Sequence, residues 1–282
     1  MNPHMTGSIH LTKIHATGND FLVLSALNGA TVSSAQAARL CDRHQGIGAD
    51  GLITLGPPET AGADCSFRLQ NADGAAAEMS GNGMRGLALV AARAGLGTAR
   101  ELVVDTPVGR RVVALTRDAA GAVTAASVAM GEACFDADRI PLDAASPFDL
   151  EATVHGVVYR GDAVGMGNPH WVLYVDDVST ARVVQHGPRL ECDGRFPKRT
   201  NVEFVKVLSR DRVEMRVWER GVGETLSCGT GACAAAAALH RRGLIDDNVT
   251  VIVPGGALAV KLGREIALAG PVVVVFEVDF EA

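Results

Sequence analysis

The sequence lacks the features of several protein classes. None of its 282 residues belongs to an apolar run of about 18 residues that could cross a bilayer. Positive charge is not in excess, because 26 Lys and Arg face 32 Asp and Glu, and the net charge of −6 offers no attraction for nucleic acid or an anionic membrane. Residues 1–8 lack the apolar core of a signal peptide, and we interpret them as an extension or a cloning remnant, with Met5 as an alternative start. We therefore expect a cytoplasmic protein without nucleic-acid or membrane partners.

The usual ligand patterns for metals and cofactors are also missing. The six cysteines have no paired short spacing typical of a zinc or redox site, and the eight histidines include no HExxH pair. Only four lysines occur, and none is evident as a Schiff-base residue. The sequence therefore predicts no metal and no cofactor.

Two glycine-rich turns form the most informative pattern that is present. Ser80-Gly81-Asn82-Gly83 and Cys228-Gly229-Thr230-Gly231 lie 148 positions apart, and each opens an alanine-rich stretch of helical character. Asn19 and Asn168 are 149 positions apart, and Asn71 and Glu219 each lie nine residues before their turn. This repeat predicts two similar domains that face each other across a cleft and supply opposed groups to one substrate.

Opposed groups are what racemisation needs, since one face of a carbon loses a proton and the other gains one. A cysteine at the start of a helix lies near free backbone N–H groups and the positive end of the helix dipole. These should lower its pKa from about 8.5 and make Cys228 a reactive thiol. The alternative is a small buried residue in a tight turn, but the repeat and the upstream run from Glu219 to Thr225 favour the reactive thiol.

Six motifs, in order and spacing, resemble the diaminopimelate epimerase family from about residue 9 to the C-terminus. They are His15-Ala16-Thr17-Gly18-Asn19-Asp20-Phe21, the run from Cys41 to Gly51, Asn71-Ala72-Asp73-Gly74, Glu78 to Arg85, Met166-Gly167-Asn168-Pro169-His170, and Trp218 to Ala232. The resemblance implies a cofactor-independent homodimeric epimerase with one catalytic cysteine per domain. Such an enzyme interconverts LL- and meso-diaminopimelate in lysine and cell-wall biosynthesis.

One departure from the family bears on the chemistry, because Ser80 stands where the family has its first catalytic cysteine. Serine has nearly the shape of cysteine but a far less acidic proton. Three interpretations are open: a deliberate substitution that traps a ligand, a natural Ser/Cys pair that still epimerises, or a one-sided site that catalyses another reaction at an amino-acid α-carbon.

The remaining site residues follow from chemistry and then from the resemblance. An amino-acid substrate carries carboxylates and ammonium groups, which amides, an Arg fork and a carboxylate can bind. The resemblance assigns His170 and Glu219 to assist the two catalytic groups. The predicted substrate-binding residues are Asn19, Asn71, Asn168, Asn201, Glu219 and Arg220, with backbone N–H groups of Gly81, Asn82, Gly229 and Thr230.

Two other function classes compete with this hypothesis. A binding or structural protein could keep the fold after losing the chemistry, but the retained Cys228, Glu219 and Arg220 argue against it. A racemase or epimerase of another amino acid would differ in the residues that bind the distal end of the substrate. The motifs alone leave this second alternative open.

Many short apolar runs and few helices predict an α+β fold of two pseudosymmetric domains. Each domain is expected to be a strand-rich, barrel-like sheet around a buried central helix. We place the N-terminal domain at 9–130 plus 271–282 and the C-terminal domain at 131–270. The predicted helices are 33–43, 84–94 and 232–242. The predicted strands are 9–14, 21–24, 101–104, 111–115, 123–130, 153–158, 171–175, 202–208, 213–218, 249–253, 257–262 and 271–280.

Overall fold

The computed structural model describes residues 8–77 and 80–281, so residues 1–7 of the proposed extension and the motif residues Glu78 and Met79 lie outside the described chain. The chain divides into two compact units. Unit 1 is Met1–Val128 with Gly270–Ala282, and unit 2 is Ala129–Ala269. Within the described residues, none of the helices has the length and apolar character needed to cross a membrane.

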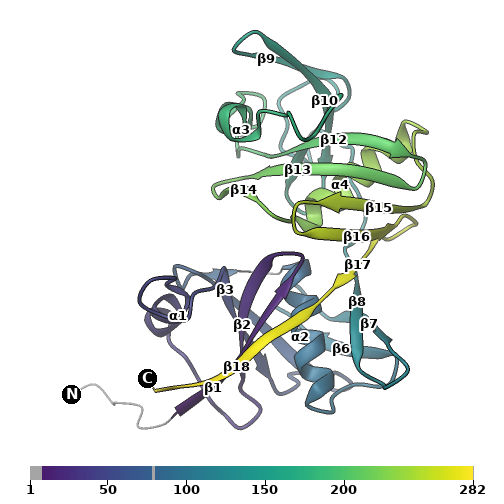
Figure 1. Cartoon of the computed structure of the whole chain (residues 1–282). Helices are drawn as coiled ribbons and strands as arrows, with labels where there is room; N and C mark the ends of the chain where they lie inside the picture. The colour runs from purple at the N-terminus through teal and green to yellow at the C-terminus, as the bar shows by residue number, and fades with distance from the viewer. Residues whose placement is uncertain (1–7, 78–79, 282) are drawn as a thin grey trace. The chain divides into compact units, whose positions relative to one another are not determined.

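Unit 1 is a mixed sheet wrapped on a central helix (Figure 1). Its strands lie in the order β18-β1-β2-β3-β4-β6-β7-β8, with β5 added to β4, and the β2–β3 and β4–β6 pairs are parallel. Helix α1 connects β2 to β3, and helix α2 lies between β5 and β6. The elements are β1 (Ser8–Ala16), β2 (Asn19–Ser25), α1 (Ser34–Cys41), β3 (Gly51–Gly56), β4 (Cys65–Asn71), β5 (Ala76–Ala77), α2 (Gly81–Arg93), β6 (Glu101–Asp105), β7 (Arg111–Arg117), β8 (Val123–Ala129) and β18 (Val273–Glu281).

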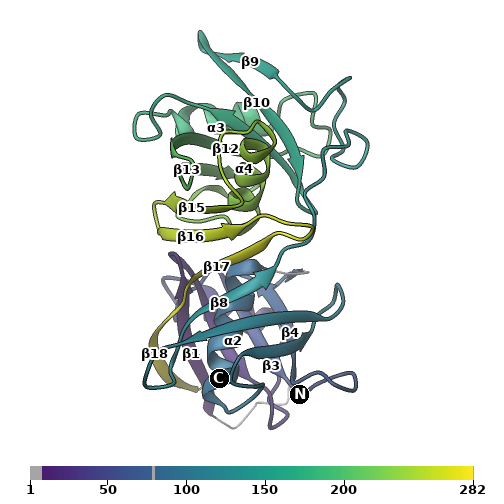
Figure 2. The same ribbon diagram turned by 90° about the vertical axis from the view of Figure 1, so that its right-hand side faces the viewer.

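Unit 2 repeats this arrangement element by element (Figure 2). Its strand order is β9-β10-β11-β12-β13-β15-β16-β17, with β14 added to β13, and the β11–β12 and β13–β15 pairs are parallel. Helix α3 takes the place of α1, and α4 that of α2. The elements are β9 (Leu150–Val154), β10 (Val157–Gly165), β11 (Pro169–Tyr174), α3 (Val183–Glu191), β12 (Asn201–Ser209), β13 (Arg212–Glu219), β14 (Gly223–Thr225), α4 (Gly229–Arg241), β15 (Asn248–Val253), β16 (Gly256–Lys261) and β17 (Ala267–Pro271).

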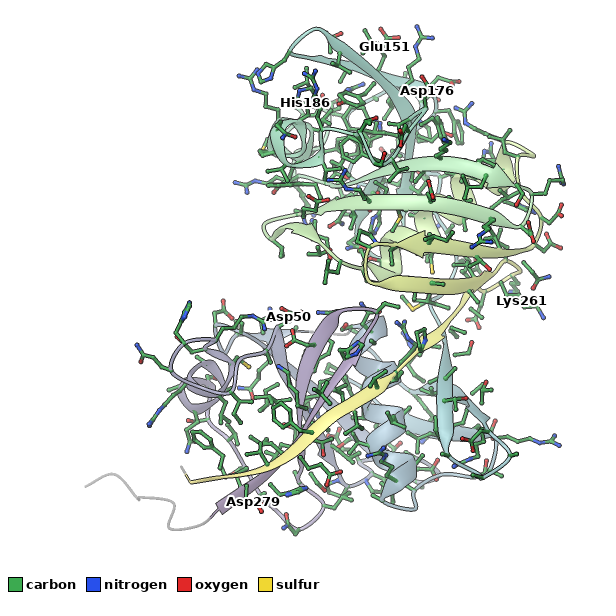
Figure 3. All side chains as sticks on the ribbon, in the orientation of Figure 1. Asp50, Glu151, Asp176, His186, Lys261 and Asp279 are labelled. Carbon is green, nitrogen blue, oxygen red and sulfur yellow. The ribbon has the colours of Figure 1, made fainter. Side chains whose placement is uncertain are left out.

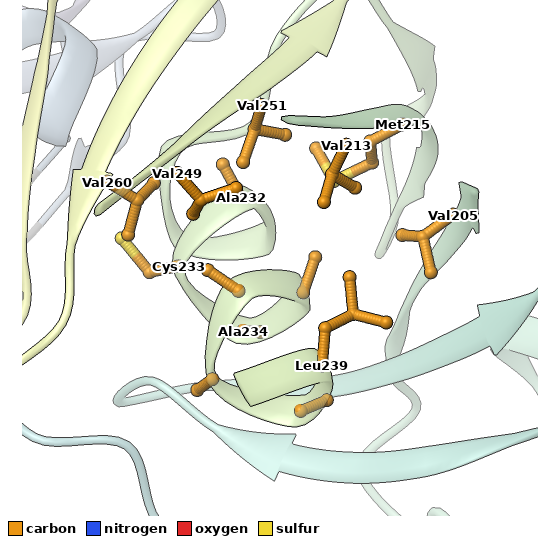
Figure 4. Close-up of a cluster of buried hydrophobic side chains, with 14 of the residues drawn as sticks. Val205, Val213, Met215, Ala232, Cys233, Ala234, Leu239, Val249, Val251 and Val260 are labelled. Atoms are coloured by element: carbon orange, nitrogen blue, oxygen red, sulfur yellow. The ribbon is translucent and has the colours of Figure 1, made fainter. Parts of the chain in front are cut away.

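The central helix of unit 2 is buried on nearly every side. The alanine run of α4 is enclosed by valines and Met215 from the surrounding strands, as Figure 4 shows. Alanine has the highest helix propensity, and its small side chain lets strands approach the helix closely. The α+β prediction with one buried helix per half is therefore confirmed. This fold places the first turn of each central helix inside its unit.

Helices α1 and α3 cover the other face of each sheet. Ser33 and Gln36 form a capping box at the start of α1, the pattern expected at a helix N-terminus. The sequence did not predict α3, because Gly187 and Pro188 lie inside it and both disfavour helix. Gly187 is required there, since a Cβ atom would lie 2.5 Å from the Trp218 ring.

Several predicted boundaries are wrong for local reasons. The predicted strand 153–158 contains the turn between β9 and β10, where His155 and Gly156 have φ of 47° and 80°. Run 271–280 is also interrupted, because β17 ends at Pro271 and β18 begins at Val273. The two central helices begin three residues before their predicted starts, since the glycine turns already form their first helical turns.

Candidate functional site

The two turns have the same local geometry, one in each unit. Ser80 and Cys228 are the N-cap residues of α2 and α4, with φ, ψ of −133°, 124° and −125°, 112°. Each side chain accepts a hydrogen bond from the backbone N–H three residues later, at 3.1 Å for Gly83 N to Ser80 Oγ and 3.4 Å for Gly231 N to Cys228 Sγ. The capping bond thus fixes both side chains at the start of a buried helix.

Glu219 is one of two acids whose charges act on the Cys228 thiol. It ends β13, and its Oε1 accepts a hydrogen bond of 2.5 Å from Thr225 Oγ1 on the paired strand β14. Burial raises the pKa of the Glu219 carboxyl, although the hydrogen bond from Thr225 and the neighbouring Cys228 thiol act in the opposite direction. The Glu219 carboxyl and the Cys228 thiol therefore affect each other's protonation.

The expectation of a lowered Cys228 pKa is wrong for this structure. Cys228 is only 5% exposed, and burial raises the pKa of its thiol well above the usual value. The charges of Glu219 and Glu203 raise it further, while hydrogen bonds with Thr230 and Gly231 lower it. Desolvation and two acidic neighbours thus outweigh the helix N-terminus, and the thiol keeps its proton.

His170 lies on the same side of the sheet as α4 and is fully buried. Its Nδ1 is 2.7 Å from Glu203 Oε1, and its Nε2 is 2.8 Å from Asn168 Oδ1. β11 and β12 are parallel partners, which places His170 opposite Asn201. The structure therefore joins two predicted residues, Asn168 and His170, to an acid that the sequence did not identify.

Asn201 and Arg220 are connected through the backbone. The Asn201 amide donates to Pro169 O at 2.9 Å and accepts from Arg220 N at 2.9 Å, so both ends of this amide bond the protein. The exposed Arg220 side chain donates to Lys198 O at 3.2 Å. Asn201 thus positions the turn that carries Arg220. The contact of Asn201 with substrate stays a prediction.

In unit 1 the asparagines are linked to each other. Asn82 Nδ2 donates to Asn19 Oδ1 at 3.2 Å, and the fully buried Arg85 donates to Asn82 Oδ1 at 2.7 Å. Gly81 and Asn82 are buried in the first turn of α2, as Gly229 is in α4, while Thr230 is half-buried. Asn71 is exposed at the end of β4.

A charged cluster extends this network. Asn19 Nδ2 donates to Asp50 Oδ2 at 2.5 Å, and Arg43 bridges Asp50 and Asp20 at 2.8 and 2.6 Å (Asp50 is labelled in Figure 3). Burial alone would raise the pKa of Asp20, but hydrogen bonds from Arg43 and Lys13 bring it down to about 2. Asp20 therefore stays ionised and holds the end of the β1–β2 hairpin.

Sequence reasoning missed Glu203, Thr225 and Asp50. A signal for Glu203 was present, because it is an acid flanked by the apolar residues Val202, Phe204 and Val205 in a predicted strand. Burying a carboxylate among apolar side chains costs free energy, so its presence there indicates a specific role. Thr225 and Asp50 carry no comparable signal, since their partners are set by strand pairing and by the loop after α1.

Comparison with known proteins identifies the family. The sequence model described as diaminopimelate epimerase matches residues 11–135 and 162–275, which include both turns. The chain belongs to the diaminopimelate epimerase family. The diaminopimelate epimerase of Heliobacterium modesticaldum is 42% identical over 277 residues, covering 95% of this chain and 98% of that protein. That of Xanthomonas campestris pv. campestris is 41% identical over 279 residues, covering 96% of each.

Solved structures of low sequence identity to this chain share its fold. A hydroxyproline epimerase from Agrobacterium vitis gives a TM-score of 0.71 at 17% identity, covering 99% of this chain and 94% of the other. A phenazine biosynthesis protein of the PhzF family from Bacillus anthracis gives 0.70 at 14% identity, covering 97% and 99%. These likenesses support the α+β architecture.

The raised Cys228 pKa predicts slow alkylation in the absence of ligand. Iodoacetamide at pH 7 should modify the exposed Cys192 before Cys228, and the Cys228 rate should rise about tenfold per pH unit as thiolate forms. Glu219→Gln removes a charge that raises the pKa, so Cys228 should react faster at pH 8, by about tenfold if its pKa falls by one. Mass-spectrometric mapping measures both rates.

Glu214→Gln is the matched control, because Glu214 lies on the same strand and is not among the charges that raise the pKa of Cys228. This variant should label like the parent. Faster labelling of Cys228 than of Cys192 at pH 7 would contradict the raised pKa.

Proposed function

We propose that the protein epimerises LL- and meso-diaminopimelate without a cofactor, with Cys228 and Ser80 as the two proton-exchanging groups. Curated relatives of nearly the same length that are named for this activity support the substrate. Epimerisation needs a base on one face of the α-carbon and an acid on the other. Each unit supplies one capped turn suited to that task.

The observation that carries the proposal is the Glu219 carboxyl, an acid close enough to the Cys228 thiol for its charge to raise the pKa of that thiol. Burial opposes a free thiolate in this position. Transfer of the thiol proton to Glu219 leaves the charge of the pair unchanged, so burial opposes it far less. Glu219 can thus generate the thiolate when substrate is bound and return the proton afterwards.

Ser80 has the same cap geometry without the same chemistry. The backbone N–H of Gly83 donates to its Oγ, so the hydroxyl proton remains available. By position in the repeat, Asn71 replaces Glu219, and Asn71 is exposed. In the described part of unit 1, no hydrogen bond joins the Ser80 hydroxyl to a carboxylate or a histidine. We infer that Ser80 transfers a proton more slowly than a cysteine would.

The remaining predicted residues would bind the substrate. Asn19, Asn71, Asn168 and Asn201 offer amides, and the exposed guanidinium of Arg220 can form a bidentate pair with a carboxylate. Backbone N–H groups in the first turns of α2 and α4 would stabilise the negative charge that develops when the α-proton leaves.

A second candidate is an epimerase or racemase of another amino acid that uses a natural Ser/Cys pair. Ser80 is the observation that favours it. The third candidate is a protein that binds diaminopimelate but converts little of it, because one of its two proton-exchanging groups is a poor acid–base group. Variants at residue 80 distinguish all three.

Ser80→Cys should raise the rate of diaminopimelate epimerisation by at least about 10²-fold, since general acid–base groups typically contribute ~10²–10⁴-fold. Ser80→Ala should leave binding nearly unchanged and abolish any turnover that the parent has. Optical rotation or chiral chromatography of the LL and meso isomers measures conversion, and calorimetry measures binding.

The Ser80→Ala variant is the matched control, because it removes the hydroxyl and little else. Epimerisation by the parent that Ser80→Ala abolishes would identify a natural Ser/Cys pair. Equal rates for the parent, Ser80→Cys and Ser80→Ala would show that residue 80 transfers no proton, and the two-base proposal would be wrong.

We also propose that the protein is a cytoplasmic homodimer. All six cysteines are free, as expected in a reducing compartment. Strand β18, which pairs with β1, exposes Val273, Val275 and Phe276 by 43–52%, and these apolar side chains at its start favour contact with a second chain.

Val275→Glu should therefore shift the protein from dimer to monomer in sedimentation velocity, because a charge would have to be buried in the contact. Val158→Glu changes a residue of equal exposure, 52%, on β10 and serves as the control. A parent that sediments as a monomer, or a dimer that Val275→Glu leaves intact, would contradict this assignment.

A further inference from the structure

Glu203 is a fully buried acid that the chemistry described so far does not use. Its Oε1 lies 2.7 Å from His170 Nδ1, and its Oε2 has no hydrogen-bond partner among the described residues. No Lys or Arg forms an ion pair with it there. A buried carboxylate with one oxygen unpaired costs stability, so packing alone does not explain the residue.

The repeat supplies a direct comparison, because unit 1 has an apolar pair at the same two positions. In unit 2 the parallel register places His170 opposite Asn201, two residues before Glu203. In unit 1 the same register places Phe21 opposite Gly51, two residues before Ile53. Phe21 and Ile53 therefore correspond to His170 and Glu203, and the fold tolerates an apolar pair there.

Contacts with the glycine turns confirm this correspondence. A Cβ atom at Gly231 would lie 2.7 Å from Glu203 Oε1, and a Cβ atom at Gly83 would lie 3.1 Å from Ile53 Cδ1. Both side chains thus press against the third residue of a central helix. The carboxylate lies beneath the turn that begins with Cys228, and its charge contributes to the raised pKa of that thiol.

His170 is held from both sides of its ring. A carboxylate oxygen accepts a hydrogen bond, so the Nδ1–H donates to Glu203. On the other side, the Asn168 amide can present its oxygen to a protonated Nε2 or, after rotation, its NH₂ group to an unprotonated one. The pair of contacts therefore accommodates both protonation states of Nε2 without moving the ring.

We propose that Glu203 is a positioning residue for His170. It fixes the Nδ1–H tautomer, directs Nε2 toward Asn168, and stabilises the imidazolium that forms when Nε2 accepts a proton. The proton enters and leaves at Nε2, while Nδ1 keeps the proton that it donates to Glu203. The inference rests on the proposed function, since that reaction supplies the proton.

Two substitutions separate the parts of this role. Glu203→Ile introduces the side chain that unit 1 has at this position, which removes the acceptor and the charge. Glu203→Gln keeps an oxygen that can accept from Nδ1–H but removes the charge. Ile53→Val is the matched control in unit 1.

The expected results involve a rate and a spectrum. Glu203→Ile should lower the kcat for α-proton exchange about 10–100-fold with little change in KM, as expected for loss of a partner that orients a reacting group. Its melting temperature should fall, because the buried Nδ1–H of His170 loses its acceptor, whereas Glu203→Gln should melt closer to the parent. The hydrogen-bonded Nδ1–H signal of ¹⁵N-labelled His170 should be present in the parent and in Glu203→Gln and lost in Glu203→Ile. Ile53→Val should behave like the parent.

Unchanged kcat in Glu203→Ile would overturn the assignment, because the residue would then be dispensable for the reaction. Absence of the Nδ1–H signal from the parent would also overturn it. A parent that exchanges no α-proton would refute the proposed function instead, and the NMR measurement would still decide the role of Glu203.

Discussion

The hydrogen bond from the third backbone N–H of each central helix to the side chain before that helix is the interaction on which both half-sites depend. It fixes Ser80 and Cys228 in the same extended conformation and makes the glycine turn the first turn of a buried helix. Glycine at the third residue gives room to a side chain from β3 or β12, which a Cβ atom there would crowd. That side chain is Ile53 in unit 1 and Glu203 in unit 2, so the turn packs on an apolar group in one unit and on an acid in the other.

This difference makes the two halves chemically unequal although their strand order is the same. Unit 2 places Cys228 near Glu219 and near Glu203, which is paired with His170, so its thiol is protonated at rest and has acids beside it. Unit 1 places Ser80 above Ile53 instead. A repeated fold therefore supplies the geometry twice, while the strong acid–base groups are concentrated in one copy.

Much of the architecture could be predicted, because the turns, the alanine-rich helices and the spacing of the asparagines are local signals that the repeat doubles. The α3 helix could not, because Gly187 is there for the Trp218 ring, a contact distant in sequence. The Cys228 pKa was predicted with the wrong sign, since the turn was visible but the desolvation and the second acid were not. The role of Glu203 could not be predicted, because only the strand register places it beside His170.

Solvent deuterium exchange at the α-carbon tests the central claim most directly. The unmodified chain should be incubated in heavy water with LL- and with meso-diaminopimelate separately, and α-deuterium measured by mass spectrometry before net conversion. If Cys228 is a competent base and Ser80 a weak one, the isomer that presents its α-proton to Cys228 should exchange faster than the other. Absence of exchange with both isomers, or equal exchange that survives Cys228→Ala, would contradict the account.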